Sequence, residues 1–166
     1  WKVFAKDNGK YVGNRLDAIQ FMRTMNFIGS SQMKNYTMEA DVMTDGNRRL
    51  MSNVGLVNQR YLFVMAANNR VLEVTSNYER VNHSVPFEAS PNTWYRLKTR
   101  VDPDRTGPGG SLRAKLWDRS QPEPDKWTLD VHLPKIHTQG APGVFAFSPQ
   151  AVRRVFIDNV SIVANE

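Results

Sequence analysis

The segment NTWYRLKTRVD at residues 92–102 decides the fold class of this chain, and SLRAKLWD at residues 111–118 repeats its pattern. In both segments mostly apolar side chains alternate with Arg, Lys and Trp. This period of two is typical of β-strands with one buried face. The intervening DPDRTGPGG at residues 102–110 is rich in Gly and Pro and predicts a hairpin loop. The two segments therefore predict paired antiparallel strands with a basic outer face.

The same alternation recurs along the chain. In Tyr36–Met43, the side chains of Met38, Ala40 and Val42 share one face. Ala18–Ile28 fits a strand or a short helix, and its strand-rich surroundings favour the strand. Further segments with strand character are Asn53–Gln59, Tyr61–Ala66, Arg70–Thr75, Trp127–Leu133, Gly143–Phe147 and Arg154–Val163. Many short, half-buried strands predict an all-β fold, a two-sheet antiparallel β-sandwich of the jelly-roll kind.

Composition narrows the class of protein. The 166 residues are 40% hydrophobic and 23% charged, which predicts one globular domain over residues 1–166. The absence of cysteine excludes disulfides, thiolate metal sites and cysteine nucleophiles. No apolar run approaches the ~20 residues that span a bilayer. The net charge of +6 favours acidic partners, but no nucleic-acid-binding motif accompanies it. Because the chain opens at Trp1, we expect a module of a longer protein.

Six motifs follow one another along the chain: NYTMEADV (35–42), VGLVNQRYLFVM (54–65), NTWYRLKTRVD (92–102), SLRAKLWD (111–118), GAPGVFAFS (140–148) and FIDNVSIV (156–163). Their order resembles the concanavalin-like, laminin-G-like β-sandwich superfamily, near bacterial domains of the 3-keto-disaccharide-hydrolase group. The stretch from Trp117 through Glu123-Pro124 to Trp127 is similar to a subgroup that follows a quinoprotein-like β-propeller. The resemblance implies a concanavalin-like fold and an exported bacterial protein, in the periplasm or on the cell surface.

Four polar residues are the candidate ligand-binding group: Glu39, Asp41, Asn58 and Arg60. If Tyr61 points into the core, strict alternation along the chain points Asn58 and Arg60 away from the core. Carboxylates, an amide and a guanidinium on one face offer the directional donors and acceptors that sugar hydroxyls need. We therefore expect these four residues to form a glycan-binding face.

The sequence also offers an enzymatic interpretation of Glu39 and Asp41, and a second charged surface. Glu39-Ala-Asp41-Val-Met-Thr44 is close to the Glu-x-Asp-x-x-Glu motif of sandwich β-glucanases, but Thr44 stands where the third carboxylate belongs. A separate basic stripe offers mostly donors, which suits bulk polyanions rather than neutral sugars. Its residues are Arg96, Lys98, Arg100, Arg113 and Lys115, with Trp117 beside them. We expect this stripe to be a solvated outer face.

The last strand places an acid among apolar residues. Asp158 has the parity of Phe156, Val160 and Ile162, and a buried carboxylate needs hydrogen-bond partners or a cation. Structural Ca²⁺ joins the last strand to the N-terminal segment in related sandwiches. The resemblance therefore implies a Ca²⁺ site with Asp158 and Asp7 as ligands. The alternative is that Asp158 caps backbone amides or pairs with an arginine.

Together these features predict a non-catalytic carbohydrate-recognition or accessory module whose partner is a glycan. One alternative is a glycoside hydrolase-like enzyme that acts on keto-sugars, as the resemblance implies. The other is a structural domain that packs on adjacent domains of its parent protein, such as a β-propeller.

Overall fold

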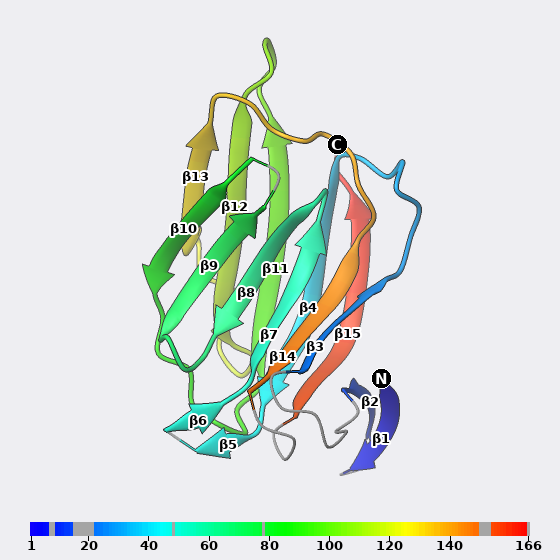
Figure 1. Ribbon diagram of the computed structural model, residues 1–166, viewed down its shortest axis with the longest axis vertical. Helices are drawn as coiled ribbons and strands as arrows, with labels where there is room; N and C mark the ends of the chain where they lie inside the picture. Colours follow the sequence, from blue (N-terminus) through cyan, green and yellow to red (C-terminus); the bar gives the residue numbers. More distant parts are fainter. Residues whose placement is uncertain (7–8, 15–21, 48, 78, 150–153, 166) are drawn as a thin grey trace.

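The computed structural model describes the chain except residues 7–8, 15–21, 48, 78, 150–153 and 166. Two antiparallel sheets pack face to face, with the six-stranded sheet in front of the seven-stranded one in Figure 1. The larger sheet has the order β1 (Lys2–Lys6), β2 (Gly9–Gly13), β15 (Val155–Ala164), β4 (Tyr36–Thr44), β11 (Tyr95–Pro103), β12 (Gly110–Asp118) and β13 (Leu129–Leu133). The smaller has the order β10 (Val81–Pro86), β9 (Val71–Ser76), β8 (Tyr61–Ala66), β7 (Asn53–Asn58), β14 (Gly143–Ser148) and β3 (Met22–Phe27).

The core lies between the sheets and is built by the predicted alternation. Met38, Ala40 and Val42 of β4 are fully buried there. Leu97 of β11 and Leu112 of β12 lie beside them, also fully buried. The strand predicted within Ala18–Ile28 is confirmed as β3 over its described part. The predicted two-sheet antiparallel β-sandwich is thus confirmed.

The hairpin between β7 and β8 gives Asn58 an orientation different from the predicted one. Asn58 pairs directly with Tyr61, so both side chains lie on one face although they are three residues apart. Gln59 and Arg60 between them have φ values of 49° and 78°, as a two-residue type I′ turn requires. Because this turn shifts the parity by one, Asn58 points into the core. The prediction that it projects outward is wrong.

A register shift in β15 changes the surroundings of Asp158. Ile157 is buried in the core, and Asp158 lies directly across from Asp41 on β4. The pairing then slips before Ser161, and Asn159 has a φ of 48°. This bulge separates Asp158 from the parity of Val160 and Ile162. Asp158 therefore shares a side with Phe156 on the outer face of the sheet, not in the core.

Several elements lie where the sequence predicted no strand. These are β1, β2, β10 and a small two-stranded sheet of β5 (Gly46–Asn47) and β6 (Leu50–Met51). β5 follows shortly after the end of β4 at Thr44, and Gly46 and Asn47 pair with Met51 and Leu50 in this short hairpin. Among the described residues, no helix is long and apolar enough to span a membrane.

Candidate ligand groove

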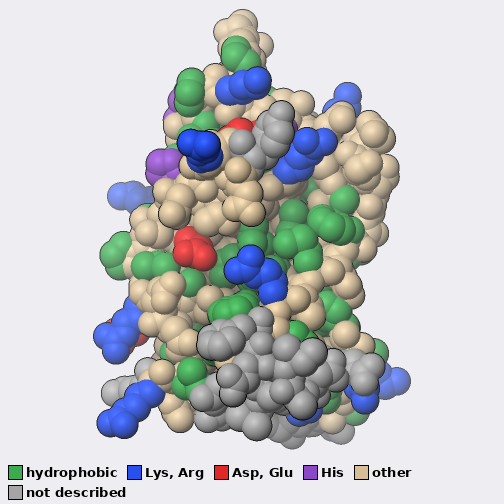
Figure 2. Space-filling view, viewed as in Figure 1, with side chains coloured by type: hydrophobic (Ala, Val, Ile, Leu, Met, Phe, Trp, Pro, Cys, Tyr) green, Lys and Arg blue, Asp and Glu red, His purple; other side chains and the backbone are tan. Residues whose placement is uncertain are grey.

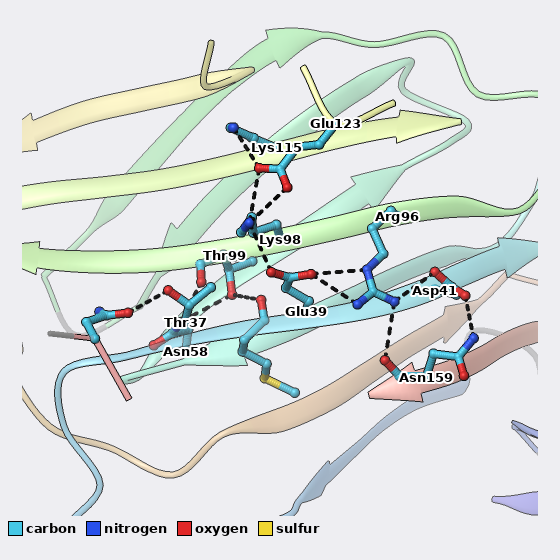
Figure 3. A network of polar contacts seen from close by, with 12 residues as sticks. Thr37, Glu39, Asp41, Asn58, Arg96, Lys98, Thr99, Lys115, Glu123 and Asn159 are labelled. Atoms are coloured by element: carbon cyan, nitrogen blue, oxygen red, sulfur yellow. Dashed lines mark hydrogen bonds and ion pairs between the residues drawn. The ribbon is translucent and has the colours of Figure 1, made fainter. Parts of the chain in front are cut away.

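Glu39 and Asp41 lie on the outer face of the seven-stranded sheet and are held in ion pairs. Arg96 of β11 lies across from Asp41, and its guanidinium is 3.0 Å from Glu39 Oε2 and 3.1 Å from Asp41 Oδ1 (Figure 3). Asp41, with 3% of its side chain exposed, also contacts Arg119 at 3.2 Å and accepts a hydrogen bond from Asn159 at 2.7 Å. Both carboxylates are thus occupied by the protein's own cations.

The rest of the predicted basic stripe lies on this same face and is equally compensated. Lys98 Nζ lies 3.0 Å from Glu39 Oε1 and 3.0 Å from Glu123 Oε2. Lys115 Nζ lies 2.7 Å from Glu123 Oε1. The remaining stripe arginines, Arg100 and Arg113, pair with Asp102, and Arg113 also with Asp130. We call this surface the ion-pair face: Glu39, Asp41, Arg96, Lys98, Lys115 and Glu123, with their neighbours.

The pKa directions of Arg96 and Glu123 both favour the charged form on this face. Burial disfavours the charged guanidinium of Arg96, yet the hydrogen bonds that it donates to Asp41 and Glu39 outweigh this effect and raise its pKa. Burial likewise works against charged Glu123, but hydrogen bonds from Lys115 and Lys98 lower its pKa below the ordinary value. The face stabilises its own charges and leaves few of them for a ligand. The sequence pattern predicted two separate surfaces, one with the acidic pair and one with the basic stripe. In the structure the strand register brings both onto one surface.

Asn58 is a structural residue between the sheets. Its side chain is fully buried, and Nδ2 donates to the Thr99 carbonyl at 3.1 Å and the Tyr36 carbonyl at 3.4 Å. These bonds join β7 to β11 and β4 across the core. Asn58 is therefore not part of any ligand face. Of the four predicted ligand residues, Arg60 alone reaches the other outer surface.

That other surface, the open face, is the side of the six-stranded sheet turned away from the core. It carries a groove of about 640 Å³. In Figure 2 hydrophobic, basic and acidic side chains gather in the middle of this face. Its lining residues are Arg23, Met25, Asn53, Arg60, Leu62, Val64, Asn69, Glu73, Thr75, Ser76, Asn77, His137, Phe145 and Phe147.

The register explains how five strands build one groove. Met25, Phe145, Gly55, Val64 and Glu73 are successive cross-strand neighbours from β3 to β9, so they form one row on the open face. Phe145 and Val64, 4% and 2% exposed, form a second apolar cluster outside the main core, with partly buried hydrophobic side chains around them. The row therefore supplies an apolar floor that ends at a carboxyl group.

Charged side chains flank this floor without ion pairs. The Arg23 guanidinium lies over the Phe145 and Phe147 rings, 5.9 and 5.7 Å from their centroids. Arg60 is exposed in the β7–β8 turn. Burial raises the pKa of the Glu73 carboxyl above its ordinary value. Within the described part of the chain, none of Arg23, Arg60 and Glu73 forms an ion pair.

Sequence reasoning missed most of this groove, although two signals were present. VLEVTS at residues 71–76 sets Glu73 opposite Leu72 and Val74, which marks a carboxylate in the middle of a strand. In GVFAFS at residues 143–148 the larger aromatic side chains alternate with Val and Ala. The smaller residues enter the core and the phenylalanines face outward. Large aromatic side chains on an outer face form an apolar patch of the kind that marks an interaction or ligand-binding site.

The predicted calcium ligands do not come together in the described residues. Asp158 is half-buried, and its Oδ1 accepts the backbone N–H of Asn159 at 2.9 Å, which matches the capping alternative. Asp7 lies outside the described residues. Among the residues that the structure describes, no group of three or more metal-ligating side chains is placed to hold an ion. The described residues do not fit a metal site at Asp158.

Comparison with known proteins gives the fold a context. No protein-family model matches the chain, and no curated protein matches it. The chain is similar to the exoplasmic/lumenal domain of VIP36 in its Ca²⁺/Man3GlcNAc-bound form, with 8% identity and a TM-score of 0.62 over 99% of this chain and 81% of that chain. It is also similar to the alginate lyase from Corynebacterium sp., with 10% identity and a TM-score of 0.61 over 98% and 79%.

A third similar structure is the legume lectin-like domain from Entamoeba histolytica, with 4% identity and a TM-score of 0.61 over 99% of this chain and 87% of that chain. At such low identity the likeness concerns the arrangement of strands alone. The two antiparallel sheets of this chain agree with that arrangement. The chain has the legume-lectin-like, concanavalin-like β-sandwich fold.

Proposed function

We propose that the chain is a carbohydrate-recognition module and that its glycan binds in the open-face groove. The observation that carries this proposal is the apolar floor of Val64 and Phe145 with the polar groups of Glu73 and Thr75 beside it. Sugar rings present apolar C–H faces and directional hydroxyls, so a site for them needs both kinds of surface. Glu73 and Thr75 supply acceptors and a donor beside the floor.

The composition of the groove favours recognition over hydrolysis. Glycoside hydrolysis by the usual routes needs two carboxyl groups on opposite sides of the scissile bond. Glu73 is the sole carboxylate among the described residues that line the groove. The shared fold with a glycan-bound lumenal domain and an alginate lyase agrees with a carbohydrate ligand.

A glycan array tests the proposal with one blocking variant and one matched control. Thr75→Trp fills the groove from β9, where Thr75 lies across from Leu62. Ser111→Trp makes a similar change on the outer face of the other sheet, where Ser111 pairs with His132. We expect the unchanged chain and Ser111→Trp to bind the same glycans, and Thr75→Trp to lose them. Equal binding by all three chains would move the glycan site elsewhere, and no binding by any would reject the function.

A second candidate function, docking on an adjacent domain, is favoured by one apolar side of the sandwich. Phe27 and Ile28 are 62% and 51% exposed at the β3 edge, and they line a hollow with Val12 and Val160, which are 39% and 40% exposed. Phe27→Asp should abolish docking on a neighbouring domain in a longer form of the protein, measured by limited proteolysis, and leave glycan binding unchanged. A loss of glycan binding in that variant would count against two separate surfaces.

The cellular setting of the module is part of the proposal. The resemblance of residues 18–166 supports an exported bacterial protein, in the periplasm or on the cell surface, and it also supports the alternative of a hydrolase-like enzyme that acts on keto-sugars. Fractionation of the source cells tests the location, and incubation with keto-disaccharides tests the alternative. Structural Ca²⁺ stays a prediction, which a thermal unfolding midpoint unchanged by a chelator would contradict.

A further inference from the structure

The open face differs from the ion-pair face in how its arginines are compensated. On the ion-pair face Arg96, Lys98 and Lys115 each lie within 3.0 Å of a carboxylate oxygen. On the open face Arg23 and Arg60 have no such partner among the described residues. Both guanidinium groups border one groove. A ligand that enters it therefore meets two positive charges with unfilled hydrogen-bonding capacity.

The position of Arg23 leaves its hydrogen-bonding edge available. A guanidinium stacked on aromatic rings is engaged through its flat face, while its N–H groups point outward in its plane. Arg23 lies over two rings, Phe145 and Phe147, and its N–H groups form no hydrogen bond within the described part of the chain. A planar fork of donors on an apolar base matches a carboxylate, which accepts two parallel hydrogen bonds, better than a single hydroxyl.

The backbone positions of the two arginines are farther apart than the width of one sugar ring. Arg23 is level with Phe147 and Asn53 in the register, and Arg60 follows Asn58 at the far end of β7. The five residue steps of strand from Asn53 to Asn58 span about 17 Å. We therefore expect a ligand that contacts both arginines to be an oligomer.

Glu73 sets the pH dependence of such a ligand. Its strand neighbours on the open face are Val64 of β8 and Ser84 of β10, both uncharged. The other charged or titratable lining groups are Arg23, Arg60 and His137, and His137 lies against Glu79. A ligand that covers the groove buries Glu73 further and favours its neutral, protonated form. Binding of an acidic ligand is then coupled to protonation of Glu73, and the affinity rises as the pH falls.

We propose that the groove selects acidic glycans, oligosaccharides whose uronate carboxylates are held by Arg23 and Arg60. This inference rests on the proposed carbohydrate function and narrows its ligand class. Neutral sugars use the floor and the polar groups but leave both guanidinium groups unfilled.

Calorimetric titration with paired ligands tests the inference. The probes are oligomers of galacturonate, guluronate, mannuronate and glucuronate, each beside its carboxyl-reduced, neutral counterpart. We expect at least one acidic oligomer to bind more tightly than its neutral pair. Arg23→Ala and Arg60→Ala should each weaken that acidic ligand about 10- to 150-fold, the range for loss of a charged hydrogen bond, and leave the neutral ligand unchanged. Arg23→Lys, which keeps the charge without the fork, should fall between.

Arg105→Ala is the matched control, because Arg105 is exposed in the β11–β12 loop and its removal lowers the net charge equally. A similar loss in Arg105→Ala would show attraction by bulk charge and overturn the inference. Equal binding of acidic and neutral oligomers would also overturn it and leave the carbohydrate function standing. If no oligomer of either kind binds and the glycan array is empty as well, the function itself fails. Glu73→Gln should remove the rise in affinity at low pH.

Discussion

The two outer faces of this sandwich handle charge in opposite ways. On the ion-pair face strand register sets Glu39 and Asp41 beside Arg96, and Asp41 keeps 3% of its side chain exposed. On the open face the strand register sets Phe145 and Val64 in a row that ends at Glu73, which has no ion-pair partner among the described residues. The first arrangement satisfies charges within the protein and contributes to folding. The second leaves them unsatisfied, which adds little to stability and suits contact with another molecule.

The largest expected effect is on the ion-pair face. Arg96→Ala removes the cation that bridges Glu39 and Asp41 and leaves a nearly buried carboxylate with fewer partners. We expect the free energy of unfolding in urea to fall by about 3 kcal/mol. Arg96→Lys, which keeps the charge, should lose less. A loss of only a few tenths of a kcal/mol in the free energy of unfolding would mean that this network behaves as ordinary exposed ion pairs do.

Glu123→Gln tests the more exposed end of the same network. It removes the shared acceptor of Lys98 and Lys115 and should cost about 1 kcal/mol at pH 7, less in high salt. Because the pKa of Glu123 is lowered by folding, its contribution is present above the unfolded-state pKa and is lost as the pH falls through the folded-state pKa. The stability gap between the two chains should therefore close on acidification. A gap that is constant between pH 7 and about pH 3 would contradict the pairing.

Glu73→Gln should show the opposite sign on the open face. Folding raises the pKa of Glu73, so the folded chain holds its proton to higher pH than the unfolded chain. Its contribution to stability therefore falls as the pH rises from the unfolded-state pKa through the folded-state value. Relative to the unchanged chain, Glu73→Gln should become more stable over that window. Denaturation curves at a series of pH values measure this, and a difference that shrinks as the pH rises would contradict it.

The smallest effects are expected from the groove arginines. Arg23→Ala loses a stacking contact and should cost about 0.5–1 kcal/mol, whereas Arg60→Ala should stay within about 0.5 kcal/mol. Thermal unfolding compares both variants with Arg96→Ala. A stability loss at Arg60 as large as that at Arg96 would show that the open face is also structural, and the contrast between the faces would disappear.

Strand positions were predictable because burial of one face leaves a direct trace in the sequence. Met38, Ala40 and Val42 alternate with polar residues, and the structure buries all three. The strands β1 and β10 left no such trace. Most residues of β10 are exposed, so no face of this edge strand needs a continuous apolar set. Local pattern therefore predicts central strands better than edge strands.

The candidate site was less predictable because it depends on which strands are neighbours. Glu39 and Arg96 lie 57 positions apart, and only the pairing of β4 with β11 brings them together. Asn58 was misplaced because Asn58-Gln59-Arg60-Tyr61 lacks the Asn-Gly signal of a two-residue turn. One unrecognised turn was enough to reverse the face assigned to β7.

The same turn has a consequence for how this chain would change under selection. Arg60 holds a φ of 78°, in the left-handed region where side chains with a Cβ are disfavoured by roughly 1 kcal/mol or more. Glycine adopts that conformation freely, so a screen for heat resistance alone should favour Arg60→Gly. The gain would come with the loss of a groove cation. Directed evolution for thermostability and for ligand affinity should therefore drive this one position toward different residues.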